Sequence, residues 1–150
     1  GDTSWASTAC ALTRRSVSEL VGGFDATSFF LYGDDVDYSW RVRLEGYRVV
    51  FEPAARVFHD KRLTVSGGWP TSAAELYYSA ESALMMAHKY SQPERVARIL
   101  NDFSASRVAH LERAARVFRD REVAGSLPEP IDPDHIVAQF VGDVYAEHRF

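Results

Sequence analysis

Three carboxylates stand close together at residues 33–37, where an apolar approach leads into the sequence GDDVD. Asp34, Asp35 and Asp37 fall at what the pattern predicts to be the first turn of a helix. The helix dipole favours ionised carboxylates there, whereas crowding three of them raises the pKa of at least one. An ionised carboxylate can take a proton from a hydroxyl group, so the cluster is a candidate for general-base chemistry. Aspartate in a first helical turn is also ordinary capping chemistry, and the cluster alone does not decide between the two.

A helix over residues 34–45 would position these carboxylates. It is predicted from a polar pair one turn apart, Asp37 and Arg41, and from an apolar stripe on another face. Gly46 is placed to end this helix. The pattern makes Trp40 a core residue first and gives Arg41 the role of orienting Asp37. The apolar stripe consists of Val36, Trp40, Leu44 and Tyr47.

His59 closes the strand-like segments that follow this helix. Residues 48–51 and 56–59 have the composition of two short strands separated by Pro53. A histidine in such a place is usually hydrogen-bonded and partly buried, and one ligand does not define a metal site. On its residues alone, His59 stays open between a structural and a metal-binding role.

The run YGDDVDYSWRVRLEGYRVVFEPAARVFH at residues 32–59 resembles a known family. It is similar to the acceptor-side half of family 2 nucleotide-sugar glycosyltransferases. There, a pattern of the type Y-G-[ED]-D-x-D-x-x-x-R-x-x-x-x-G-Y is followed by P-x-A-x-x-x-H. Residues 12–16 and 22–25 look like the family's preceding "RR-S" and "GGFD" segments. The resemblance therefore covers roughly residues 8–60.

The resemblance implies an inverting transfer on a GT-A type fold, in which one carboxylate deprotonates the acceptor hydroxyl. Asp35 matches the family's base, and Asp34 stands where the family usually has glutamate. His59 matches a histidine that helps to hold a divalent cation, Mn²⁺ or Mg²⁺, on the nucleotide diphosphate. The family adds a D-x-D motif from its nucleotide-binding half, but none in a strand-end context precedes residue 30. The DVD of residues 35–37 follows the base position on a helix and is not counted as that motif.

Further residues are expected to contact substrate. Asp37, Trp40 and Arg41 lie within the matched motif. An indole such as that of Trp5 can stack on a sugar ring, and the cationic and aromatic side chains after residue 60 can meet a phosphate or lipid headgroup. Residues of these types are more often ordinary surface residues. The cationic and aromatic side chains after residue 60 are Lys61, Arg62 and Trp69.

The composition excludes some classes of function. Seventeen basic residues are scattered among 21 acidic ones, with a formal charge of −4, so no basic face predicts nucleic-acid binding. The single cysteine, Cys10, is expected to be a small buried residue in a reducing compartment. The sequence has neither a signal-peptide pattern nor the roughly 20-residue apolar run that a membrane span needs. We expect a cytoplasmic protein, held at the inner face of the membrane if its acceptor is lipid-linked.

The sequence divides into three predicted parts. Residues 1–65 are expected to form the acceptor and catalytic half of a GT-A type domain, 66–124 a helical extension packed on it, and 125–150 a linker with a C-terminal amphipathic helix. The fold class is α/β, with a partial mixed sheet and helices followed by an α-helical region. Its first strand is predicted at residues 9–12.

The remaining helices are predicted from apolar periodicity and from capping patterns. Ser16 and Ser72 each begin an S-x-x-E capping box, and Asp132 is placed as the N-cap of the last helix. Pro93 sits at the first turn of a long helix with a break near Ser104. These helices span residues 16–21, 72–90, 93–120 and 132–145.

The sequence thus favours a bacterial glycosyltransferase of cell-wall or polysaccharide synthesis. It is expected to transfer sugar from a nucleotide-sugar donor to a glycan or lipid-linked acceptor, with Asp35 as general base. As a fragment lacking the nucleotide-binding half of the same domain, it is expected to be inactive alone. The alternative is a noncatalytic, glycosyltransferase-like interaction or regulatory module. A hydrolase using Asp34 and Asp35 as an acid and base pair ranks last, because adjacent residues at a helix start rarely face one substrate from opposite sides.

Overall fold

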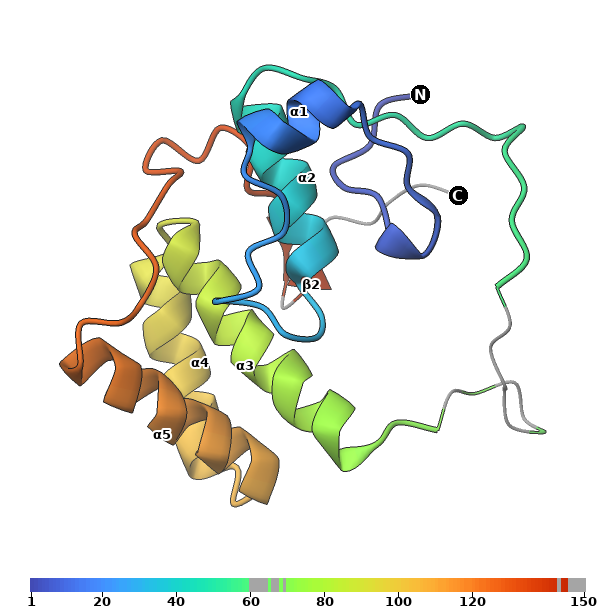
Figure 1. The fold of residues 1–150 in the computed structure, drawn as a ribbon. Helices are drawn as coiled ribbons and strands as arrows, with labels where there is room; N and C mark the ends of the chain where they lie inside the picture. The colour runs from blue at the N-terminus through green and yellow to red at the C-terminus, as the bar shows by residue number, and fades with distance from the viewer. Residues whose placement is uncertain (60–64, 66–67, 69, 143, 146–150) are drawn as a thin grey trace.

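Helices are the main regular elements of the computed structural model, which describes residues 1–59, 65, 68, 70–142 and 144–145 (Figure 1). The described elements are a 3-10 helix at Thr8–Cys10, the α-helices α1 (Arg15–Leu20), α2 (Asp34–Leu44), α3 (Ala73–Lys89), α4 (Pro93–Ala105) and α5 (Ala109–Val123), and the strands β1 (Phe140–Val141) and β2 (Val144–Tyr145). Among the described residues, no helix is both long and apolar enough to cross a membrane.

Helix α2 is flanked by two glycines with positive φ, of which Gly46 was predicted to end it. Gly33 has φ 74° at its N-cap, and Gly46 has φ 79° just beyond its last turn. Two bonds close the end of the helix, from the Gly46 amide to the Arg43 carbonyl at 3.0 Å and from the Tyr47 amide to the Val42 carbonyl at 3.2 Å. The helix predicted over residues 34–45 is thus confirmed.

Helices α3, α4 and α5 pack against one another, each contacting the other two (Figure 1). The predicted capping box of α3 is confirmed, because Ser72 Oγ accepts from the Glu75 amide and Glu75 from the Ser72 amide. Pro93 is the first residue of α4, as predicted. The long helix predicted from there is two helices, because the chain turns at residues 106–108, with Arg107 at φ 55°. The break was expected near Ser104.

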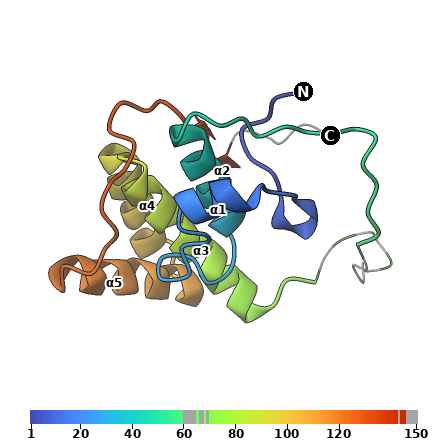
Figure 2. The same cartoon turned by 45° about the horizontal axis from the view of Figure 1, so that its top comes forward.

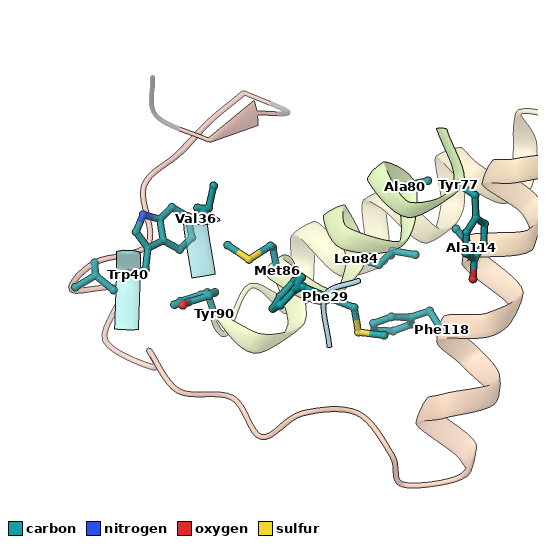
Figure 3. Packing of buried hydrophobic residues seen from close by; sticks show 12 residues of the cluster. Phe29, Val36, Trp40, Tyr77, Ala80, Leu84, Met86, Tyr90, Ala114 and Phe118 are labelled. Carbon is teal, nitrogen blue, oxygen red and sulfur yellow. The ribbon is translucent and has the colours of Figure 1, made fainter. Parts of the chain in front are cut away.

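The core runs the length of α3 and joins α2 at one end to α5 at the other. Figure 3 shows Trp40, Val36 and Tyr90 at the α2 end and Phe118 and Ala114 at the α5 end. A smaller cluster lies where α1 and α2 are side by side in Figures 1 and 2. The main cluster consists of Phe29, Val36, Trp40, Tyr77, Ala80, Leu84, Met85, Met86, Tyr90, Ala114, Phe118 and Val137, and the smaller one of Val17, Tyr38 and Val42.

The mixed sheet predicted for the first part of the chain is not seen in the described residues. The strand at residues 9–12 is wrong, since this stretch is a 3-10 turn followed by irregular chain, and the strand at 56–59 is also wrong. That at 48–51 is reduced to one bridge, between Asp2 and Val50. A strand is stable only when neighbouring strands satisfy its backbone groups, and residues 51–59 run away from the helices in both ribbon views.

The C-terminal helix predicted at residues 132–145 is also wrong in its described part. Asp132 is buried, and its carboxylate accepts hydrogen bonds from three successive amides, at 2.8 Å from Ile136, 3.1 Å from Val137 and 2.9 Å from Ala138. Those amides are committed to one side chain, which holds a loop in place of a helix. The chain then forms the antiparallel pair β1–β2.

Two smaller predictions also fail. Cys10 is exposed, not buried. Helix α1 has Arg14 as its N-cap without a side-chain hydrogen bond, so the capping box at Ser16 does not form. Glu19 instead pairs with Arg15 at 2.7 Å, one turn earlier.

Candidate active site

The first turn of α2 is held close to α3 through Gly33. A Cβ atom at this glycine would collide with Ser82 Oγ of α3 and would lie 3.2 Å from Phe29 Cδ1 and 3.4 Å from Met86 Cγ. Just before it, Tyr32 donates a hydrogen bond to Glu75 Oε1 at 3.1 Å, so the approach to α2 is tied to the start of α3 as well. The backbone that carries the three carboxylates is therefore fixed on two sides.

Asp34 and Asp35 are partly exposed at this first turn. The Oδ1 atom of Asp35 accepts a hydrogen bond from the Val36 amide at 2.9 Å. Both carboxylates lie at the N-terminal, positive end of the α2 dipole. The structure thus leaves these two carboxylates partly open to solvent.

Tyr145 of β2 lies within electrostatic reach of Asp35. Burial raises the pKa of Tyr145, and the negative charge of Asp35 adds to this, while a hydrogen bond with Ser82 opposes it. The tyrosine ring packs edge-on against Trp40, with the centroids 5.9 Å apart. The β1–β2 hairpin therefore closes one side of the α2 start, a contribution that sequence reasoning missed by predicting a helix there.

Asp37 differs from the other two carboxylates because it is fully buried, with a side-chain exposure of 0%. Its Oδ2 accepts from Arg41 Nε at 2.8 Å, and its Oδ1 lies 2.7 Å from Lys89 Nζ. The hydroxyl of Tyr90 donates to Asp37 Oδ1 at 3.1 Å and to its carbonyl oxygen at 3.0 Å. Burial and the nearby charge of Asp37 raise the pKa of Tyr90 well above its usual range. The predicted Asp37–Arg41 pair is confirmed, within a larger network.

Lys89, the last residue of α3, joins that network to the GGFD loop. Its ammonium lies 2.8 Å from Asp25 Oδ2, and its side chain is 6% exposed. Asp25 Oδ1 in turn accepts from the amides of Thr27 and Ser28 at 3.2 and 3.1 Å. Partial burial of Asp25 favours its neutral form, but the hydrogen bonds from Lys89 and Ser28 outweigh this and lower its pKa to about 2.

Arg41 completes the network by holding the loop before α2. It donates to the carbonyl oxygens of Val21 and Gly23, the latter at 2.7 Å. An open depression of about 410 Å³ lies beside this network. It is lined by Arg41, Lys89 and residues 21–27. Two buried or half-buried cations thus face two carboxylates, Asp25 and Asp37, so the network adds no net charge to this depression.

Sequence reasoning assigned no role to Lys89, Tyr90 or Asp25. Lys89 lies one helical turn after Met85, on the face of α3 that enters the core. A lysine on an apolar helix face is the one sequence signal that could have indicated a buried ion pair. Lysine is almost never fully buried unless it is paired. The partners come from segments far away in sequence, which periodicity cannot reveal.

The two tryptophans predicted as substrate contacts, Trp40 and Trp5, both pack against the core cluster. Trp40 has 0% exposure, and its indole donates to Ser4 Oγ at 3.0 Å. Its ring meets Tyr90 edge-on at 4.8 Å, so the core role predicted from the helical stripe is confirmed. Trp5 is partly buried against the same core cluster. Trp40 is therefore closed to solvent, whereas Trp5 keeps part of its surface exposed, and its predicted contact with a sugar stays a prediction.

His59 lies apart from the carboxylates. His59 is exposed, and the segment of residues 51–59 to which it belongs runs away from the helices in Figures 1 and 2, whereas Asp34 and Asp35 lie in the first turn of α2. Within the described part of the chain, no three metal-ligating side chains come together. Lys61, Arg62 and Trp69 lie outside the described residues, so their predicted contacts stay predictions.

Two glycosyltransferases of Mycobacterium tuberculosis resemble part of the chain. A stretch of 57 residues is 44% identical to an N-acetylglucosaminyl-diphospho-decaprenol L-rhamnosyltransferase, which covers 38% of this chain and 18% of that protein. A stretch of 59 residues is 42% identical to a pre-mycofactocin glycosyltransferase, which covers 39% of this chain and 12% of that protein. No family model and no solved structure matches the chain.

These alignments support a general relation to glycosyltransferases. The matched stretches span less than a fifth of either relative. The geometry adds that one carboxylate of the α2 start is withdrawn into a buried network, while two stay partly exposed.

Proposed function

We propose that this chain supplies the acceptor-side, general-base part of an inverting glycosyltransferase of GT-A type. The observation that carries the proposal is the 44% identity over 57 residues to a rhamnosyltransferase. The donor, a nucleotide sugar, is proposed to bind to a nucleotide-binding half of the same domain. An inverting transfer needs one general base to take the proton of the acceptor hydroxyl, and a carboxylate of α2 can supply it.

Asp35 is the proposed base. As the acceptor hydroxyl oxygen attacks the anomeric carbon, its proton passes to the Asp35 carboxylate, and the nucleoside diphosphate leaves from the opposite face with the bonding electrons. A partly exposed, ionised carboxylate suits this role, and the positive end of α2 favours that ionised form. Asp37 is unsuited to it, because its oxygens are buried against Lys89 and Arg41.

The acceptor is proposed to be a glycan or a lipid-linked sugar. The support is the name of one relative, which acts on N-acetylglucosaminyl-diphospho-decaprenol. A lipid-linked acceptor would place the protein at the inner face of the membrane. Bacterial cell-wall or polysaccharide synthesis is the proposed setting.

The described residues do not by themselves form a divalent-cation site. His59 is exposed, and no group of three metal-ligating side chains forms within the described ranges. The role of His59 as a ligand for Mn²⁺ or Mg²⁺ stays a prediction from the family resemblance. No step proposed for Asp35 depends on a bound cation.

The test is replacement of the proposed base in the complete protein. Asp35→Asn keeps the size and hydrogen-bonding shape of the side chain but cannot accept the proton. We expect kcat to fall by roughly two to four orders of magnitude, with melting temperature and donor affinity nearly unchanged. Asp34→Asn is the matched control at the same helix turn and should cost much less.

The assay uses uridine, guanosine and thymidine diphosphate sugars as donors and an N-acetylglucosaminyl diphosphate polyprenol as acceptor. If Asp35→Asn kept activity within a few fold, the base assignment would be wrong. If the complete wild-type protein transferred no sugar to this acceptor or to glycans, a noncatalytic interaction module would become the better description.

A further inference from the structure

We propose that Lys89 is a positioning residue for Asp35: its ammonium ties the end of α3 to the first turn of α2 and so fixes the direction of the base. The inference rests on the proposed function for its catalytic consequence. Its structural part rests on the contacts of Lys89 alone. Lys89 lies outside residues 8–60, the part of the sequence that resembles glycosyltransferases.

The contacts of Lys89 converge on the segment that carries the base. One carboxylate partner, Asp37 at 2.7 Å, lies two residues after Asp35 in the same helical turn. The other, Asp25 at 2.8 Å, belongs to the loop that leads to α2. The ring of Phe29 lies 5.4 Å from the ammonium, in the same lead-in segment. One cation therefore contacts the chain on both sides of Gly33.

Because Asp35 and Asp37 belong to one helix, the contact of Asp37 with Lys89 also fixes the direction in which the Asp35 side chain points. Successive helical residues are turned by about 100°, so residues two apart point to nearly opposite sides, about 200° around the axis. Holding the Asp37 carboxylate inward against Lys89 therefore turns Asp35 outward. The amide of Asp37 also makes the first helical bond of α2, to the Gly33 carbonyl at 2.8 Å, so the side chain and backbone of Asp37 are both anchored.

The burial of the tie makes its geometry specific. Side-chain exposure is 6% for Lys89 and 0% for Asp37, so water screens this ion pair little. Tyr90, the next residue along, donates to both the carboxylate and the carbonyl of Asp37, which adds a second anchor from the same end of α3. Removing the ammonium would leave Asp37 with Arg41 as its remaining described cation. The first turn would then have one charged contact fewer to α3.

The test compares Lys89→Met with Phe118→Leu in the complete protein. Methionine keeps the length and apolar stem of lysine and removes the charge. Phe118 is a core residue of α5, so its replacement lowers stability at the far end of α3. We expect Lys89→Met to lower kcat per folded molecule about tenfold or more, with KM for the polyprenyl acceptor within about twofold of wild type. Phe118→Leu should lower the melting temperature and leave kcat per folded molecule unchanged.

Hydrogen exchange gives a measurement that does not depend on activity. In Lys89→Met, the amides of residues 36–38 should exchange about tenfold faster than in wild type, while those of α5 keep their rates. If these rates are unchanged, Lys89 does not hold the turn and the inference fails. If wild type transfers no sugar, the proposed function fails, and exchange alone decides whether the tie exists.

A double variant tests whether Lys89 acts through Asp37. Asp37→Asn alone and Lys89→Met alone should each lower kcat, and the double variant should be no worse than the poorer single one. Additive losses would show that Lys89 acts by another route and would overturn the inference. A loss of rate that simply follows the unfolded fraction, as in a destabilised core variant, would also overturn it.

Discussion

At the scale of single residues, the most informative feature is a set of four buried or half-buried charges that cancel. Asp25 and Asp37 are carboxylates, and Lys89 and Arg41 are the cations that meet them. Buried ion pairs contribute little net stability, because desolvation offsets their attraction, but loss of one partner leaves an uncompensated charge. We infer that the set determines how α2, α3 and the GGFD loop fit together more than it adds to the free energy of unfolding.

Asp25 should give part of the stability a defined pH dependence. Its folded-state pKa is about 2, below the ordinary value of 3.8, so its stabilising effect is fully present above pH 4 and is lost as pH falls toward 2. Asp25→Asn should therefore lower the free energy of unfolding by about 1–2 kcal/mol at pH 6, and the difference from wild type should shrink below pH 4.

Urea denaturation of both proteins between pH 6 and pH 2 measures this difference. Asp134→Asn, at an exposed loop position, is the control and should track wild type across the range. A gap between wild type and Asp25→Asn that stays constant with pH would show that the Asp25 carboxylate is not held ionised by Lys89.

At the scale of elements, the close approach of α2 to α3 depends on one missing side chain. Gly33→Ala combines a positive φ of 74° with a Cβ that would collide with Ser82 Oγ. We expect a loss of about 2–4 kcal/mol of unfolding free energy, from backbone strain and overpacking together.

Gly46→Ala is the matched control at the other end of the same helix. Its φ is 79°, but a Cβ there meets nothing within 4 Å, so only the strain of about 1 kcal/mol applies. Thermal or urea denaturation compares the two variants. Equal losses would mean that the contact with Ser82 relaxes freely and that Gly33 is required for its backbone conformation alone.

Elements that depend on local sequence were predictable, and those that depend on partners were not. The helix at α2 follows from the apolar spacing and from Gly46, and α3 follows from its capping box at Ser72. Strands need neighbours, so short apolar runs such as residues 56–59 gave a false signal. The helix predicted after Asp132 failed because one buried carboxylate binds three backbone amides, a contact that no periodicity encodes.

In the candidate site, too, contacts within one helix were predictable from the sequence and contacts between distant segments were not. The pairing of Asp37 with Arg41 follows from helical spacing, which the sequence shows directly. Lys89 lies 52 positions beyond Asp37 in the printed sequence, and the tie between them exists only once α3 packs beside α2. Long-range ion pairs of this kind require the tertiary arrangement.

At the scale of the whole molecule, apolar side chains outside the core mark a surface that the described helices do not cover. Val57 and Phe58 lie in the stretch that runs away from the helices, with exposures of 56% and 103%. Val50, at the isolated bridge with Asp2, is 51% exposed. The helical core around α3 is complete without these residues, so they contribute nothing to its packing.

The chain by itself should therefore bind nucleotide sugars weakly or not at all. Its described residues bring together no three metal-ligating side chains, and its depression beside Arg41 and Lys89 has both cations already paired with carboxylates. A diphosphate needs unpaired cationic or amide donors to bind tightly. Isothermal titration of the 150-residue chain with uridine, guanosine and thymidine diphosphate sugars, with Mn²⁺ or Mg²⁺ present, should show no binding tighter than about millimolar, and no transfer product should form. The complete protein under the same conditions is the positive control. Micromolar binding by the chain alone, about 8 kcal/mol, would mean that it holds a full donor site and that the proposed division between donor and acceptor halves is wrong.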